Sequence, residues 1–147
     1  MKKSILTNIA LIVCFGFANA TVKTDIEAAN KAGKAVFLVV TETGNSNNTT
    51  AITLGKEAQK KYPKSTVIEM NRSDKANESL VAQYRLAGAP TPLILVIANN
   101  GIVSGGAPYN QTTAGDLVAM IPSPQKAEVL KTINEGKSVF LVVVKNR

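Results

Sequence analysis

Apolar runs alternate with segments of helical periodicity along most of the chain. Continuous apolar stretches predict strands. The turn residues Asn99-Asn100-Gly101 predict that the two strands on either side of them form a hairpin. The predicted strands are residues 35–40, 66–70, 93–97 and 102–103. The predicted helices are residues 25–32, 49–62, 77–86 and 113–121. Helices and strands in this alternation are typical of a mixed sheet covered by crossover helices.

The first twenty residues have the pattern of a secretory signal peptide. Lys2 and Lys3 precede an apolar stretch at 9–17, and Ala18-Asn19-Ala20 has the small residues of a cleavage site. A membrane span is the weaker interpretation because the apolar run is shorter than the roughly 20 residues that a bilayer requires. Lipidation at Cys14 is disfavoured by the bulky residue before it. We therefore expect a periplasmic or extracellular protein with no membrane span after cleavage, its first domain at residues 21–121.

Composition narrows the chemistry that the chain can carry. The 147 residues suit one domain, and 45% apolar against 18% charged residues is ordinary for a globular protein. Histidine is absent and Cys14 is the only cysteine. These counts exclude histidine-based triads, histidine-ligated metals and an internal disulfide, so we expect no metal and no cofactor.

The net charge of +7 raises the question of a nucleic-acid partner. The lysines at 56–61 lie in a segment of helical character with no interleaved aromatic residues. A solvated helix face explains this cluster better, and we predict no nucleic acid among the partners.

Gly88-Ala89-Pro90-Thr91 stands between a predicted helix and an apolar strand that leads into the hairpin. This segment resembles the cis-proline segment of the thioredoxin-like family, and the order of elements over residues 24–121 is similar to that family as well. The resemblance implies an α/β, thioredoxin-like fold with a central mixed sheet of about four to five strands flanked by helices.

The resemblance places the redox motif of the family on residues without thiols. Its Cys-x-x-Cys pair would fall on Asn45-Ser46-Asn47-Asn48, and its buried acid would fall on Val39. An amide cannot form a thiolate or a disulfide. The resemblance therefore implies a redox-inactive relative.

The resemblance also implies a groove for polypeptide. A cis bond before Pro90 would turn Ala89 outward, so that its N–H and C=O could pair with an extended peptide. The alternative is that Pro90 only sets the entry of the strand. The predicted peptide-binding residues are Asn45, Ser46, Asn47, Asn48, Ala89, Pro90 and Thr91. We predict a binding or scaffolding module rather than an enzyme.

Three other functions stay open at the level of sequence. A thioredoxin-fold enzyme could use Ser46, Thr49 or a helix N-terminus to activate a ligand thiol such as glutathione. Residues 41–46 resemble the phosphate loop of flavodoxins, which would bind flavin mononucleotide. The third alternative is a fragment without a function of its own.

The C-terminal segment repeats the beginning of the domain. Residues 136–143 match residues 33–40 at a constant offset of 103 positions. Residues 122–147 are therefore predicted to be a linker and a partial second repeat, made of a helix and one strand, as in a tandem protein cut short. A strand at 139–144 is apolar on both faces, so we expect it to pair with its own sheet or with another molecule, which includes a homodimer.

Overall fold

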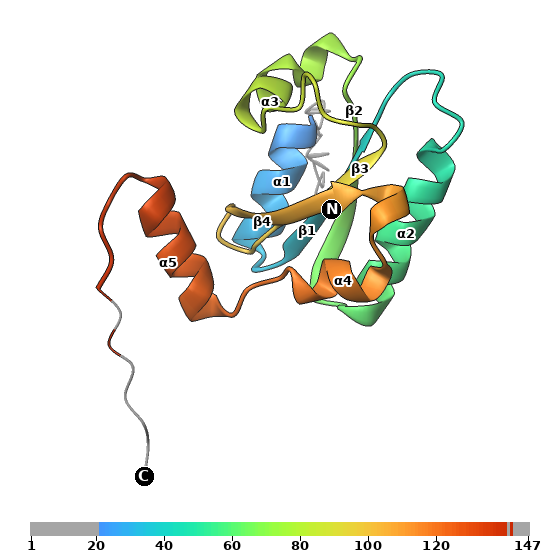
Figure 1. Cartoon of the computed structure of the whole chain (residues 1–147). Coiled ribbons are helices and arrows are strands. Elements are labelled where there is room, and N and C mark those ends of the chain that lie inside the picture. Colours follow the sequence, from blue (N-terminus) through green and yellow to red (C-terminus); the bar gives the residue numbers. More distant parts are fainter. Residues whose placement is uncertain (1–20, 141, 143–147) are drawn as a thin grey trace, which may run out of the picture.

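The computed structural model describes residues 21–140 and Val142, and its elements follow the predicted order (Figure 1). The predicted signal peptide lies outside the described residues. The strands are β1 (Ala35–Thr41), β2 (Ser65–Asn71), β3 (Leu93–Ile97) and β4 (Val103–Pro108). The α-helices are α1 (Val22–Lys31), α2 (Asn48–Lys61), α3 (Glu78–Gln83), α4 (Ala114–Ala119) and α5 (Pro124–Asn134). Short 3₁₀ turns occupy Lys75–Asn77 and Tyr109–Gln111.

The strands form one mixed sheet in the order β2-β1-β3-β4. β1 and β2 are parallel, whereas β3 is antiparallel to both of its neighbours. The predicted α/β, thioredoxin-like architecture is thereby confirmed, with four strands. The flavodoxin-like alternative is wrong for this chain because that fold continues with parallel strands.

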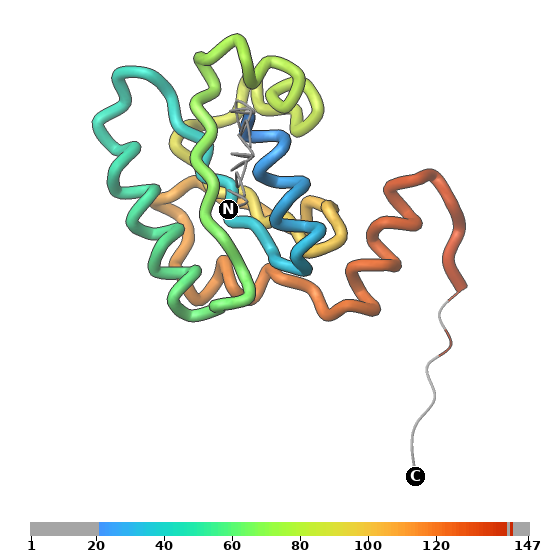
Figure 2. The backbone as a smooth tube through the Cα atoms, turned by 180° about the vertical axis from the view of Figure 1, so that it is seen from behind, coloured from blue at the N-terminus to red at the C-terminus, as the bar shows by residue number. Residues whose placement is uncertain are grey.

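Strand β1 lies at the centre of the molecule and is buried on both faces. Val36, Leu38 and Val40 point into a core with α1 and α3. Phe37 and Val39 point into a second core with α2 and α4. Gly55 lets α2 approach β1 closely, since a Cβ there would lie 3.0 Å from Val39 Cγ2. Figure 2 shows from behind how the helices enclose the sheet.

Among the element boundaries that differ from the sequence prediction, those of α3 and β4 have a clear physical cause. Helix α3 ends at Gln83 because the chain turns at Arg85, whose φ is 55°, and the Leu86 N–H returns to the Val81 carbonyl. β4 continues through Gly105 and Gly106 to Pro108, beyond the predicted strand at 102–103, and its pairing with β3 shifts register between Val96 and Ile97, next to Gly105. A Cβ at Gly106 would lie 2.6 Å from Leu95 Cδ2, so glycine is what allows β4 to pair with β3 here.

The C-terminal segment forms the predicted helix but no strand within the described residues. Helix α5 stands at one side of the domain (Figure 1), and its Glu128 accepts a hydrogen bond of 3.2 Å from Asn100 of the hairpin turn. Residues 137–140 and Val142 belong to no strand, and the rest of the predicted strand at 139–144 lies outside the described residues. The described residues pair with no sheet edge, so they lack the neighbour that a strand requires.

Candidate functional site

The loop that precedes α2 meets the segment that precedes β3. Asn45 Nδ2 donates a hydrogen bond of 3.0 Å to the Thr91 carbonyl, although 46 residues separate them. Ser46 and Asn47 are exposed beside this contact. The structure therefore brings together the two predicted halves of the site, the Asn45 to Asn48 loop and Thr91.

Side-chain amides hold this loop in shape. Asn48 Nδ2 donates to the Glu42 carbonyl at 2.7 Å, and Asn48 Oδ1 accepts from the Glu42 N–H at 3.3 Å. The Asn47 N–H donates to Asn45 Oδ1 at 3.0 Å. An amide can donate and accept at once, as these bonds require. Asn45 and Asn48 thus have structural roles at the positions where the family resemblance puts cysteines.

The prediction about Pro90 is wrong in two respects. The cis bond joins Thr91 to Pro92, immediately before β3, and Pro90 is exposed. Two X-Pro bonds stand two residues apart, and the sequence pattern does not distinguish them. Ala89 is also unavailable, because its N–H donates to Leu86 and its carbonyl accepts from Arg72 Nη1 at 2.7 Å.

Glu42 and Arg72 form an ion pair that the sequence analysis missed. Arg72 Nη2 lies 2.7 Å from Glu42 Oε1, and the Thr91 hydroxyl donates to Glu42 Oε2 at 2.6 Å. Arg72 Nη1 also donates to the Leu86 carbonyl at 3.0 Å. One guanidinium therefore ties the ends of β1 and β2 to the segment 86–91 that leads to Thr91. Both residues directly follow parallel strands, whose carboxyl ends lie at one sheet edge, and that signal could have revealed the pair.

The ion pair makes the loop sensitive to acid. The Arg72 hydrogen bond, with help from the Thr91 hydroxyl, holds the pKa of Glu42 below its ordinary value of 4.5. A lowered folded-state pKa means that the stabilisation is present above the unfolded value and is lost as pH falls through the folded value. We expect the wild-type protein to lose this contribution below about pH 4.5.

Glu42→Gln should therefore lower the stability of the fold at pH 7. It should also make the stability decrease less steeply than in the wild type as the pH is lowered. Urea unfolding midpoints measured between pH 7 and pH 3 check this expectation, with the exposed Glu27→Gln as the control for loss of one carboxylate. If Glu42→Gln and the wild type have parallel midpoint profiles, the ion pair does not stabilise the fold.

An open groove lies at the start of α2. It has a volume of about 430 Å³ and lies between the first turns of α2 and the segment after β4. Its lining residues include Thr49, Thr50, Thr53, Leu54 and Tyr109. The Tyr109 N–H donates to the Pro92 carbonyl at 3.2 Å, which fixes this wall of the groove next to Thr91. The groove offers hydroxyl groups and one aromatic ring to a ligand.

Within residues 21–140, no helix is long and apolar enough to cross a bilayer. The same part of the chain holds no group of three or more His, Cys, Asp or Glu side chains that could share a metal ion. The described features define a thioredoxin-like α/β domain with an amide-containing loop before α2.

A scan against models of protein families gives no match, and a search of curated proteins gives none either. Solved structures do match. A chain described as DsbH oxidoreductase is 14% identical with a TM-score of 0.47, over 88% of this chain and 95% of that chain. A disulphide isomerase from Xylella fastidiosa Temecula1 is 14% identical with a TM-score of 0.42, over 85% of this chain and 99% of that chain. The assignment of the fold rests on the strand order and directions described above.

Proposed function

We propose that this domain is an exported, redox-inactive thioredoxin-like module that binds an extended segment of another protein. The observation that carries the proposal is the Asn45–Thr91 contact. It is linked to the open groove through Tyr109, which lines the groove and whose N–H donates to the carbonyl of Pro92, the residue after Thr91. It joins the α2 loop to the entry of β3, the two elements between which the family resemblance puts a polypeptide. With Cys14 as its only cysteine, the chain has no pair of thiols for disulfide exchange.

The binding residues differ from those that the sequence predicted. The Thr91 N–H has no hydrogen-bond acceptor among the described residues, whereas the Thr91 carbonyl accepts from Asn45. An extended peptide would therefore accept from the Thr91 N–H and place a side chain in the groove beside Thr53 and Tyr109. Hydroxyl groups and an aromatic ring suit a ligand side chain that is small or amphipathic.

Blocking the groove tests this proposal. Thr53→Glu introduces a larger, charged side chain on its floor, beside Glu57, and is expected to weaken binding of a labelled, permanently unfolded polypeptide about tenfold. Ala82→Glu is the matched control, because it adds the same group at an exposed helical position outside the groove. Fluorescence anisotropy titrations measure both affinities. Equal affinities for the two variants would contradict the groove.

Two further assays separate the alternatives. Heat released on titration with glutathione would favour the thiol-activating enzyme over the binding module. Turnover in a disulfide reductase assay would overturn the redox-inactive part of the proposal.

Export is tested by recovering the chain, cleaved before Thr21, from the periplasm of a bacterial host.

A further inference from the structure

Helix α5 ends in the same way as helix α1, residue for residue. Gly33 and Gly136 both follow the helix in the left-handed conformation, with φ of 70° and 74°. In α1 the closing bonds are Ala32 N–H to Ala28, Gly33 N–H to Asn30 and Lys34 N–H to Ala29. In α5 they are Glu135 N–H to Lys131, Gly136 N–H to Ile133 and Lys137 N–H to Thr132. Each bond of the second set lies 103 positions after its counterpart.

The residues after these two glycines have opposite environments. Phe37 is 0% exposed, whereas its counterpart Phe140 is 95% exposed. Val39 is 0% exposed, and its counterpart Val142 is 83% exposed. We call the described residues 137–140 and Val142 the arm. A sequence that is buried between two layers of helices in β1 is thus open to solvent in the arm.

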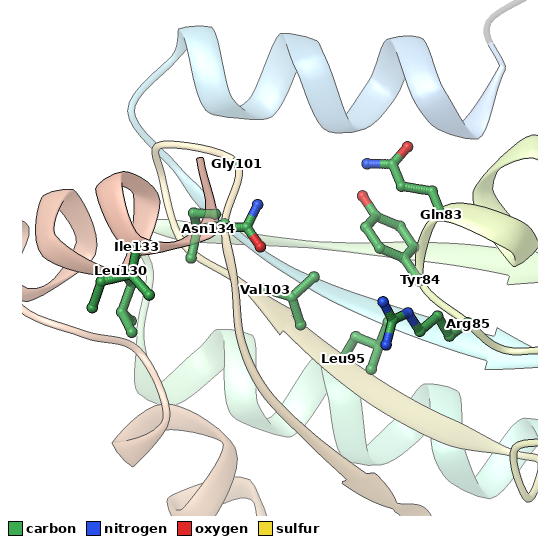
Figure 3. Close-up of a pocket in the computed structure, with 10 residues that line it drawn as sticks. Gln83, Tyr84, Arg85, Leu95, Gly101, Val103, Leu130, Ile133 and Asn134 are labelled. Carbon is green, nitrogen blue, oxygen red and sulfur yellow. The ribbon is translucent and has the colours of Figure 1, made fainter. Parts of the chain in front are cut away.

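A second groove lies between α5, the end of α3 and the edge of the sheet (Figure 3). Its volume is about 450 Å³, and its apolar lining is Tyr84, Leu95, Ile102, Val103, Leu130 and Ile133. Val103 is 40% exposed and Ile133 is 56% exposed. Val103 belongs to β4, the last strand of the sheet, whose outer edge pairs with no strand in the described chain. The groove therefore offers apolar side chains, and it meets the unpaired outer edge of strand β4 at Val103.

We propose that the arm of one molecule binds in this groove of a second copy, along the outer edge of β4, and buries Phe140 and Val142. The second copy is the occupant because the described residues after α5 run down the side of this helix that faces away from the sheet (Figures 1 and 2), whereas the groove is on the other side, lined by Leu130, Ile133 and Asn134 of α5. Arms exchanged in both directions give a closed twofold dimer. This inference goes beyond the proposed function and shares no residue with the peptide groove.

Cysteine crosslinking tests the exchange. Residues 21–147 contain every described element and no cysteine. Two single-cysteine variants, Val142→Cys in the arm and Gln83→Cys on the groove rim, are given tags of different mass, mixed and oxidised. The expected mixed disulfide dimer should form about tenfold more than in a mixture of Val142→Cys with Lys56→Cys on α2. Equal yields of the two mixtures overturn the proposal. A variant that carries both Val142→Cys and Gln83→Cys gives a second check: an intramolecular disulfide in it, with no dimer from the mixed single variants, also overturns the proposal.

Light scattering after size exclusion gives an independent readout. The wild type is expected to be a dimer, and Phe140→Asp is expected to be a monomer with an unchanged circular dichroism spectrum. Ser138→Asp adds the same charge in the arm without removing an apolar side chain, and it should remain dimeric. A monomeric wild type overturns the proposal, and so does a Phe140→Asp variant that stays dimeric.

Discussion

Replacing Phe37 by alanine is expected to lower the free energy of unfolding by about 3–5 kcal/mol. Phe37 is completely buried on the central strand, among Val39, Ile94, Ala51 and Leu117. Alanine would leave a cavity lined by two strands and two helices, which cannot close without moving the sheet. Urea unfolding monitored by circular dichroism measures the change.

Phe37→Leu is the control for this site. It keeps most of the volume, so its cost should be about 1 kcal/mol. A loss for Phe37→Ala no larger than that for Phe37→Leu would show that the core between β1 and α2 is loosely packed.

Arg72→Ala should have the second largest effect, about 2–4 kcal/mol. The Arg72 side chain is only 16% exposed, and its removal leaves the Ala89 carbonyl without a donor. The Leu86 carbonyl and the Glu42 carboxylate each lose one of two donors and keep those from the Ala89 N–H and the Thr91 hydroxyl. Because the segment 86–91 loses its tie to β2, limited proteolysis should cut it faster as well. Unfolding midpoints and cleavage rates measure the two effects.

Arg72→Lys separates charge from geometry. Lysine keeps the positive charge but lacks the planar fork that reaches Glu42 and the two carbonyls together. We expect an intermediate loss of stability. If Arg72→Lys matches the wild type, charge alone stabilises the segment, and the hydrogen bonds to the carbonyls contribute little.

The fold could be predicted because each strand carries a local signal. The apolar runs at 35–40 and 93–97 agree with β1 and β3 to within one residue, and Gly101 supplies the positive φ of the hairpin turn. β4 could not be delimited in the same way. In the sequence its glycines indicate either a bulge or a strand end, and only the approach of Leu95 explains why the strand needs Gly106.

The site was predicted only in part. Asn45 and Thr91 were found through the family resemblance, which aligns short segments. Glu42 and Arg72 come together through the parallel register of β1 and β2, in which Thr41 faces Asn71. The position of both residues directly after a strand is visible in the sequence, but it points to this pair only once β1 and β2 are taken as parallel neighbours. The choice between Pro90 and Pro92 likewise depends on where β3 begins, which a proline-rich tetrapeptide leaves open.

The hydrogen bonds of Asn45 and Asn48 bear on the evolution of the domain. If an ancestor carried cysteines at these two positions, changes in two codons would be enough to reintroduce both cysteines into the sequence. The reverted chain would nevertheless lose the contacts to Thr91 and to the Glu42 backbone, because a thiol is a weak donor and cannot replace an amide. Natural reversion to a dithiol enzyme would thus first require another way to hold the loop.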